Sequence, residues 1–217
     1  MPTPAPALPR VYPGDVLLVI DPQQDFCAGG RLAVPDGDAV IPLINQLARQ
    51  FPHVILTQDW HTPGHTSFFS SHPGRIPYES VDAPYGPQTL WPDHCVQGTS
   101  GAEFHPDLDI PFAELILRKG FRPGLDSYSA FFENDKTTPT GLAGYLRERR
   151  FERIFLAGLA YDYCVRYSAV DAVRAGFSAF VIEDACRAID LAGSVTATRQ
   201  EFDQTGVRSV HSTGGGG

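Results

Sequence analysis

The chain has 217 residues, of which 42% are hydrophobic and 19% are charged, with a formal net charge of −8 at neutral pH. This length suits one α/β domain with a full core, and the acidic balance argues against nucleic acid or an anionic membrane as a partner. The four cysteines are widely spaced, which argues against a disulfide framework and suits a reducing cytoplasm. We therefore expect a cytoplasmic protein that acts on a small molecule, as a monomer or a homo-oligomer.

The two ends of the chain differ in composition from the rest. Residues 2–9 alternate proline with small residues, and four glycines close the chain. Such compositions favour extended or flexible segments. We predict a flexible tail over residues 1–13, a single α/β domain over residues 14–211, and a second flexible tail over residues 212–217.

The domain is expected to begin with a buried strand at residues 15–20, an unbroken apolar run of the kind that parallel sheets bury on both faces. A helix pattern follows at residues 40–47, and a second strand pattern at residues 54–57. A helix between two strands forms a crossover, so we expect these strands to be parallel.

From about residue 60 to residue 111 the periodic pattern gives way to glycine, proline, histidine and aromatic residues. This segment is far longer than the ~2 to 6 residues of an ordinary connection after a strand. Long connections in compact domains are usually functional. We predict that it is an insertion that binds a metal ion.

The alternation of strands and helices then resumes. Strand patterns occupy residues 115–117, 153–158, 180–182 and 207–210, and helix patterns occupy residues 141–150, 164–173 and 195–204. This order predicts an α/β fold with a doubly wound, mainly parallel six-stranded sheet and helices on both faces. Ligands bind such sheets at the carboxyl ends of the strands.

Three chemically active side chains are expected at that edge. Asp21 and Lys119 each follow a strand, and Cys164 lies in the first turn of a helix, where free N–H groups favour a thiolate. Each alone could be structural, as a turn cap, a solvated lysine and a packed cysteine. Together they are a nucleophile, a base and an electrostatic partner, with backbone N–H groups around Ala160 and Cys164 as an oxyanion hole.

A second polar set follows the strand at residues 54–57. Asp59 and His61 are two positions apart, so their side chains should point the same way, and His65 and His94 lie further along the insertion. One carboxylate and three imidazoles suit one divalent ion, Fe²⁺, Zn²⁺ or Mn²⁺. The alternative is a polar loop whose histidines cap backbone groups, and the spacing alone leaves both open.

Several stretches of the sequence resemble one known family. They are VIDPQQDF at residues 19–26, DWH at 59–61, WPDHCVQGT at 91–99, RKG at 118–120 and GLAYDYCV at 158–165. In this order they closely resemble the nicotinamidase/pyrazinamidase branch of the isochorismatase-like hydrolases. The resemblance spans nearly the whole chain and implies a catalytic triad and a metal site, formed respectively by Asp21, Lys119 and Cys164 and by Asp59, His61, His65 and His94.

The resemblance also implies a cis peptide bond between Leu159 and Ala160, which would aim the Ala160 N–H into the oxyanion hole. Tyr161 departs from the family pattern, in which a small threonine is usual. The packing beside the oxyanion hole therefore stays open.

The activity that the resemblance implies is that of a metal-containing cysteine amidohydrolase. It would convert nicotinamide to nicotinate and ammonia through a thioester, and pyrazinamide to pyrazinoate. The substrate ring would lie among Phe26, Trp91 and Tyr128, with Leu159 as a further contact. The alternatives are another hydrolase of the wider family, such as an N-carbamoyl amide hydrolase or an isochorismatase, a metal-hydroxide hydrolase, and a non-catalytic ligand sensor on the same fold.

Overall fold

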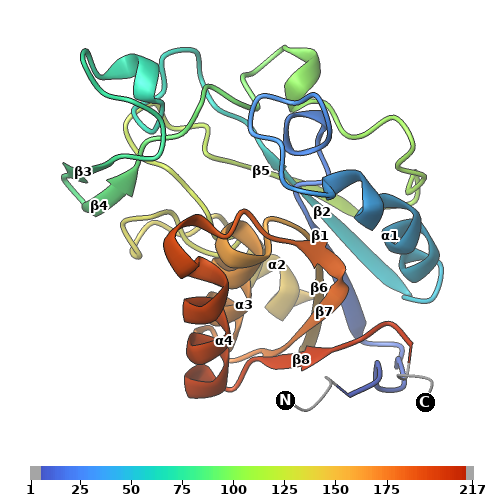
Figure 1. The fold of residues 1–217 in the computed structure, drawn as a ribbon. Coiled ribbons are helices and arrows are strands. Elements are labelled where there is room, and N and C mark those ends of the chain that lie inside the picture. Colours follow the sequence, from blue (N-terminus) through green and yellow to red (C-terminus); the bar gives the residue numbers. More distant parts are fainter. Residues whose placement is uncertain (1–5, 214–217) are drawn as a thin grey trace.

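The structure, a computed structural model, describes residues 6–213. In these residues a six-stranded sheet with strand order β5-β2-β1-β6-β7-β8 forms the centre of the molecule (Figure 1). Every pair of neighbouring strands in it is parallel, as the sequence predicts. The strands are β1 (Asp15–Ile20), β2 (His53–Asp59), β5 (Leu115–Lys119), β6 (Arg153–Leu159), β7 (Ser178–Arg187) and β8 (Arg208–Val210).

Helices cover both faces of this sheet, which confirms the predicted fold class (Figure 1). In β1, Leu17 and Val19 face the apolar cluster that contains α1, whereas Leu18 and Ile20 face the cluster that contains the other helices. This division follows from the alternation of side chains along a strand. The helices are α1 (Val40–Ala48), α2 (Leu142–Glu148), α3 (Arg166–Arg174) and α4 (Ser194–Thr205).

The described part of the first predicted tail lies against the sheet. Ala7 forms a parallel bridge with His211, and the Leu8 N–H donates to the His211 carbonyl at 2.7 Å. The segment from residue 6 is thus attached beyond the end of β8. Residues 1–5 and 214–217, on which most of the glycine-rich tail prediction falls, lie outside the described residues.

The long connection between β2 and β5 is mostly irregular, as predicted, but it contains a hairpin that the sequence analysis missed. Strands β3 (Ser80–Ala83) and β4 (Gly86–Thr89) pair antiparallel across a two-residue turn. Both strands are short and carry few of the β-branched or aromatic residues that indicate strands. Among residues 6–213 no helix is long and apolar enough to cross a membrane.

The chain leaves β6 by an unusual route. Gly158 has a φ of 123°, and a Cβ atom there would lie 2.1 Å from the Ile20 carbonyl oxygen, so only glycine fits. The Leu159–Ala160 peptide bond is cis, as expected from the resemblance. Residues 161–165 then form a π-helical turn before α3, so Cys164 lies in this wider turn rather than in the first α-helical turn that the sequence suggested.

Candidate active site

The carboxyl edge of the sheet brings together the three residues predicted as catalytic. Asp21 follows β1, Lys119 ends β5, and Cys164 lies in the turn after β6. The Lys119 ammonium nitrogen is 2.8 Å from Asp21 Oδ2 and 3.4 Å from Cys164 Sγ. All three residues are buried, at 0% exposure for Asp21, 1% for Lys119 and 6% for Cys164. Their proximity therefore occurs in a setting that excludes water, where charge interactions are strong.

Burial shifts the protonation equilibria of Asp21, Lys119 and Cys164. It raises the pKa of the Cys164 thiol well above its usual value, even though Lys119 opposes the rise. The sequence suggested a thiolate at this position, but loss of solvent outweighs the favourable start of the helix. Burial also raises the pKa of Asp21, whereas Asp21 and Asp59 raise the pKa of Lys119 against the effect of burial. The arrangement is a neutral thiol beside a carboxylate with raised proton affinity and a permanent ammonium.

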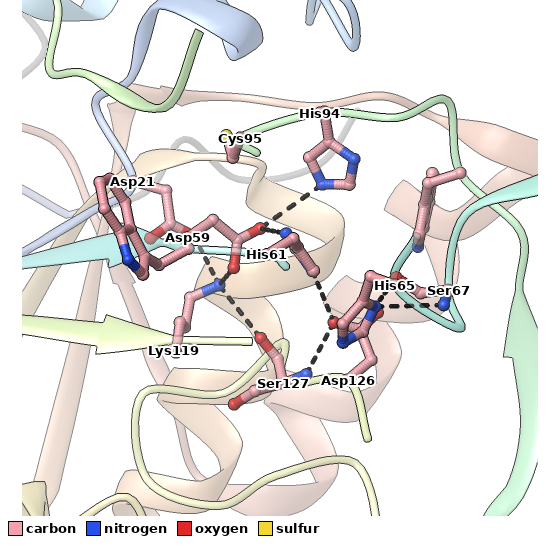
Figure 2. Close-up of polar contacts among 12 residues, drawn as sticks. Asp21, Asp59, His61, His65, Ser67, His94, Cys95, Lys119, Asp126 and Ser127 are labelled. Atoms are coloured by element: carbon pink, nitrogen blue, oxygen red, sulfur yellow. Dashed lines mark hydrogen bonds and ion pairs between the residues drawn. The ribbon is translucent and has the colours of Figure 1, made fainter. Parts of the chain in front are cut away.

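Lys119 also joins this group to the second predicted set. Its ammonium donates to Asp59 Oδ1 at 2.7 Å and to the Ser127 carbonyl at 3.1 Å (Figure 2). Burial would raise the pKa of Asp59, but Lys119 and His61 outweigh it and hold that pKa well below the usual range. Asp59 therefore stays ionised, as a metal ligand must.

Three of the four predicted metal ligands converge. Potential ligand atoms of Asp59, His61 and His94 all lie within 4.8 Å of one another. Among residues 6–213, the buried His61 Nδ1 has no hydrogen-bond partner, and it lies 3.9 Å from Asp59 Oδ2. His94 donates from Nδ1 to the Pro92 carbonyl at 2.8 Å, which leaves the lone pair of Nε2 free, 3.5 Å from the same carboxylate oxygen. One ionised carboxylate with two uncommitted ring nitrogens fits a divalent metal ion.

His65 does not join this set. Its Nδ1 accepts from the Ser67 N–H at 3.1 Å (Figure 2). Its Nε2 donates to the Arg122 carbonyl at 2.8 Å, so both ring nitrogens are engaged. The structure groups His65 with His61 and Asp126 instead. The predicted four-residue ligand set is thus a three-residue set in this arrangement, with His65 supporting the adjacent loop.

Asp126 is a functional candidate that the sequence analysis missed. Its Oδ1 accepts from His61 Nε2 at 3.0 Å, which holds a proton on Nε2 and leaves Nδ1 as the ring nitrogen that can bind a metal. Burial would raise the pKa of Asp126, but the hydrogen bond from His61 outweighs it and holds the pKa at about 2. The signal in the sequence was an acidic residue in an irregular stretch shortly after the strand that ends at Lys119.

A narrow cavity opens onto both groups, since its lining includes Cys164 as well as Asp59, His61 and His94. The predicted Phe26, Trp91 and Tyr128 line it together with Cys164 and Ala160. Three further lining residues, which the sequence pattern did not indicate, are Leu32, Tyr163 and Ile189.

Two residues near the cavity bear on expectations from the sequence. One is a predicted substrate contact, and the other is the tyrosine beside the oxyanion hole. Leu159 is fully buried in the apolar core and does not line the cavity, so its prediction as a substrate contact is wrong in this arrangement. Tyr161 also stays outside the cavity, because its hydroxyl donates to Glu183 at 2.9 Å and its ring packs edge-on against Phe202. The larger residue at this position therefore leaves the space beside Ala160 unchanged.

A separate group of Cys27, Asp38 and His105 also has metal-binding residue types. Here the donors are already engaged, because Asp38 accepts from the Ala28 N–H at 2.7 Å and from His105 Nε2 at 3.2 Å, and His105 Nδ1 accepts from the Asp107 N–H at 3.2 Å. This group is a hydrogen-bonded tie between loops. It lacks the uncommitted nitrogens that distinguish His61 and His94.

Comparisons with known proteins all point to one family. A family model described as the isochorismatase domain matches residues 15–210. A nicotinamidase of Acinetobacter baylyi is 52% identical over 196 residues, which cover 90% of this chain and 92% of the relative.

Solved structures give the same picture. A nicotinamidase and pyrazinamidase of Acinetobacter baumanii is 53% identical with a TM-score of 0.92, over 93% of this chain and 97% of that chain. A pyrazinamidase of Pyrococcus horikoshii in complex with zinc is 33% identical with a TM-score of 0.74, over 91% of this chain and 99% of that chain.

Proposed function

The chain belongs to the isochorismatase domain family, and from this premise we propose that it is a nicotinamidase, which hydrolyses nicotinamide to nicotinate and ammonia. One observation carries the proposal. At the cavity, Lys119 Nζ lies 2.8 Å from Asp21 Oδ2 and 3.4 Å from Cys164 Sγ, which places a base and a fixed cation beside a nucleophile. The high identity to nicotinamidases supports the choice of substrate.

The reaction begins at the thiol. Because burial raises the pKa of both Cys164 and Asp21, the thiol needs a base, and the Asp21 carboxylate is suited to take its proton. Lys119 stays charged beside both groups and balances the negative charge as it moves from the carboxylate to the sulfur. The thiolate attacks the carboxamide carbon, and the backbone N–H groups of Ala160 and Cys164 are the proposed donors to the oxyanion.

Asp21 then returns the proton to the leaving nitrogen. The carbon–nitrogen bond breaks, ammonia departs, and a nicotinoyl thioester remains on Cys164. A water molecule that gives a proton to Asp21 attacks the thioester carbonyl. This step releases nicotinate and returns the proton to the sulfur, so the thiol and the carboxylate are restored.

The cavity walls orient the substrate. Phe26 and Trp91 line the cavity together with Tyr128 and Tyr163, and Tyr163 packs edge-on against Trp91 with ring centroids 4.8 Å apart. A flat aromatic ring can lie between such walls with its carboxamide toward Cys164. Pyrazinamide has the same carboxamide on a six-membered ring, so we include it as a second substrate.

Asp59, His61 and His94 would hold one divalent ion, Fe²⁺, Zn²⁺ or Mn²⁺. Such an ion would supply a Lewis acid for the ring nitrogen of the substrate. The similarity to a pyrazinamidase solved with zinc supports a divalent ion at these residues. In this scheme Cys164, and not a metal-bound hydroxide, is the nucleophile.

An ammonia-release assay tests the proposal. The purified chain is given nicotinamide, pyrazinamide and an N-carbamoyl amide at equal concentration, with metal analysis of the same sample. Ammonia release from the two ring amides, and little from the carbamoyl compound, is the expected result. Preference for the carbamoyl compound would contradict the proposal and favour another hydrolase of the family.

A further inference from the structure

The β3–β4 hairpin places one buried amide, the side chain of Gln88, next to two parts of the site: the metal-ligand set and the aromatic wall of the cavity. Gln88 on β4 is 1% exposed, and its Nε2 lies 3.1 Å from Asp126 Oδ2, 2.9 Å from the Tyr128 hydroxyl and 2.7 Å from the Thr89 carbonyl. Three acceptors thus share its two N–H groups. Gln88 itself does not line the cavity, so its role must pass through its neighbours.

One neighbour leads to the metal ligands. Asp126 Oδ2 accepts from Gln88, while Asp126 Oδ1 accepts from His61 Nε2 at 3.0 Å and from the Ser127 N–H at 2.8 Å. With both oxygens bound, the carboxylate cannot turn, and the His61 ring keeps its Nδ1 on the side of Asp59. Such outer contacts of a ligating histidine fix the orientation of its ring.

The other neighbour leads to the aromatic wall. The Tyr128 hydroxyl accepts from Gln88 and also from the Trp91 indole N–H at 2.9 Å. The Trp91 and Tyr128 rings meet nearly at a right angle, with an interplanar angle of 82°. One phenol oxygen therefore holds both rings in place, and Gln88 holds that oxygen.

The far side of the amide is fixed as well. Gln88 Oε1 accepts from the Tyr85 hydroxyl and from Asn134 Nδ2, each at 3.1 Å. The Asn134 side-chain oxygen in turn accepts from the Tyr128 N–H at 3.0 Å. Every polar atom of Gln88 is therefore engaged, which gives the amide one orientation.

We propose that Gln88 is a positioning residue that sets the spacing between the metal ligand His61 and the ring wall of Trp91 and Tyr128, and so selects flat single-ring amides. This inference rests on the proposed function, because the ring between wall and metal ligands is that of the substrate. Under this inference the hairpin helps to determine which substrate rings fit the cavity, whereas the catalytic triad acts on the carboxamide.

Three variants separate the two connections. Asp126→Asn alters the connection to His61, Tyr128→Phe removes the oxygen shared with Trp91, and Gln88→Met removes both connections at nearly constant side-chain length. Tyr145→Phe is the matched control, because its hydroxyl bonds Glu114 away from the cavity. For each variant, the metal dissociation constant is measured by chelator competition without substrate, and KM and kcat for nicotinamide at saturating metal.

We expect Asp126→Asn to weaken metal binding about 10- to 100-fold. Tyr128→Phe raises KM with metal affinity unchanged, and Gln88→Met weakens metal binding and raises KM, each by about tenfold, with kcat changed less than about threefold. Tyr145→Phe changes neither quantity. If Gln88→Met alters only one quantity or neither, the inference is overturned.

If Gln88→Met does not fold, the double variant of Asp126→Asn and Tyr128→Phe decides. The inference predicts that Asp126→Asn also raises KM through the shared amide, and that the effects of the two substitutions on KM combine non-additively, by more than about threefold. Independent effects would overturn it. The metal dissociation constant is measured without substrate, so it does not depend on the amidase activity. If the unaltered chain released no ammonia, the proposed function would be overturned, and the effect of each variant on metal binding could still be measured.

Discussion

The two halves of the site are built differently. The catalytic half is formed by Asp21 directly after β1, Lys119 at the end of β5 and Cys164 in the turn that follows β6, and backbone pairing within one sheet sets the spacing of these strand ends. The metal half depends on loops, since His61 and His94 come from the long connection after β2, and the hydrogen bonds that they donate to Asp126 and the Pro92 carbonyl orient their rings. We therefore expect the first half to tolerate little change in its own residues and the second half to be sensitive to residues that never touch the substrate.

The largest effect is expected in the catalytic half. Cys164→Ala removes the nucleophile and should lower kcat for nicotinamide by about a thousandfold or more. The metal ligands are separate residues, so the metal content should stay equal to that of the unaltered chain. Ammonia release and metal analysis on one preparation measure both. Substantial activity in this variant would favour a metal-hydroxide mechanism.

The second largest effect is expected at Lys119, which contacts both the catalytic half and the metal half. Lys119→Met leaves the buried carboxylates of Asp21 and Asp59 without their cation and should lower the free energy of unfolding by about 3 kcal/mol or more. Arg75→Met is the control, with an expected loss below about 1 kcal/mol because this side chain is 52% exposed and its ion pair with Glu79 is long, at 3.9 Å. Urea unfolding measures both variants. Equal stability losses would show that the buried ammonium is not the link between the halves.

Within the metal half, two histidines are expected to differ. His94→Gln removes an uncommitted nitrogen and should weaken metal binding by at least about 100-fold. His65→Gln should weaken it only a few-fold, since both nitrogens of His65 already bond Ser67 and Arg122. Chelator competition compares the two. Similar losses would restore the four-ligand set predicted from the sequence.

The smallest effect on the kinetic constants is expected at Tyr161, which lies next to Ala160 in the sequence but outside the cavity. Tyr161→Phe removes the hydroxyl that bonds Glu183 outside the cavity and should change kcat and KM less than about twofold. Steady-state kinetics with nicotinamide measures the change. A tenfold effect would mean that this hydroxyl acts on the oxyanion hole after all.

The same division explains what could be predicted from the sequence. The apolar run at residues 15–20 predicts β1 with its observed bounds, and strand ends of a parallel sheet share one edge, so Asp21 and Lys119 could be placed together. The roles of Asp126 and Gln88 could not be found this way. Asp126 bonds a residue 65 positions away, Gln88 bonds one 38 positions away, and neither stands in a periodic pattern.

Leu159 shows the opposite error. Phe155, Ala157 and Leu159 alternate along β6 and all pack in the same apolar cluster. Strand alternation alone would have placed Leu159 in the core. The prediction of Leu159 as a substrate contact did not use this alternation, and the observed strand places its side chain in the core.

The covalent intermediate tests the central claim most directly. The unaltered chain is mixed with excess nicotinamide, quenched in acid during turnover, digested and examined by mass spectrometry. We predict a nicotinoyl group on the peptide that contains Cys164 and its absence from peptides that contain the other cysteines. Steady ammonia release with Cys164 unmodified at every quench time, even when thioester hydrolysis is slowed, would contradict the account.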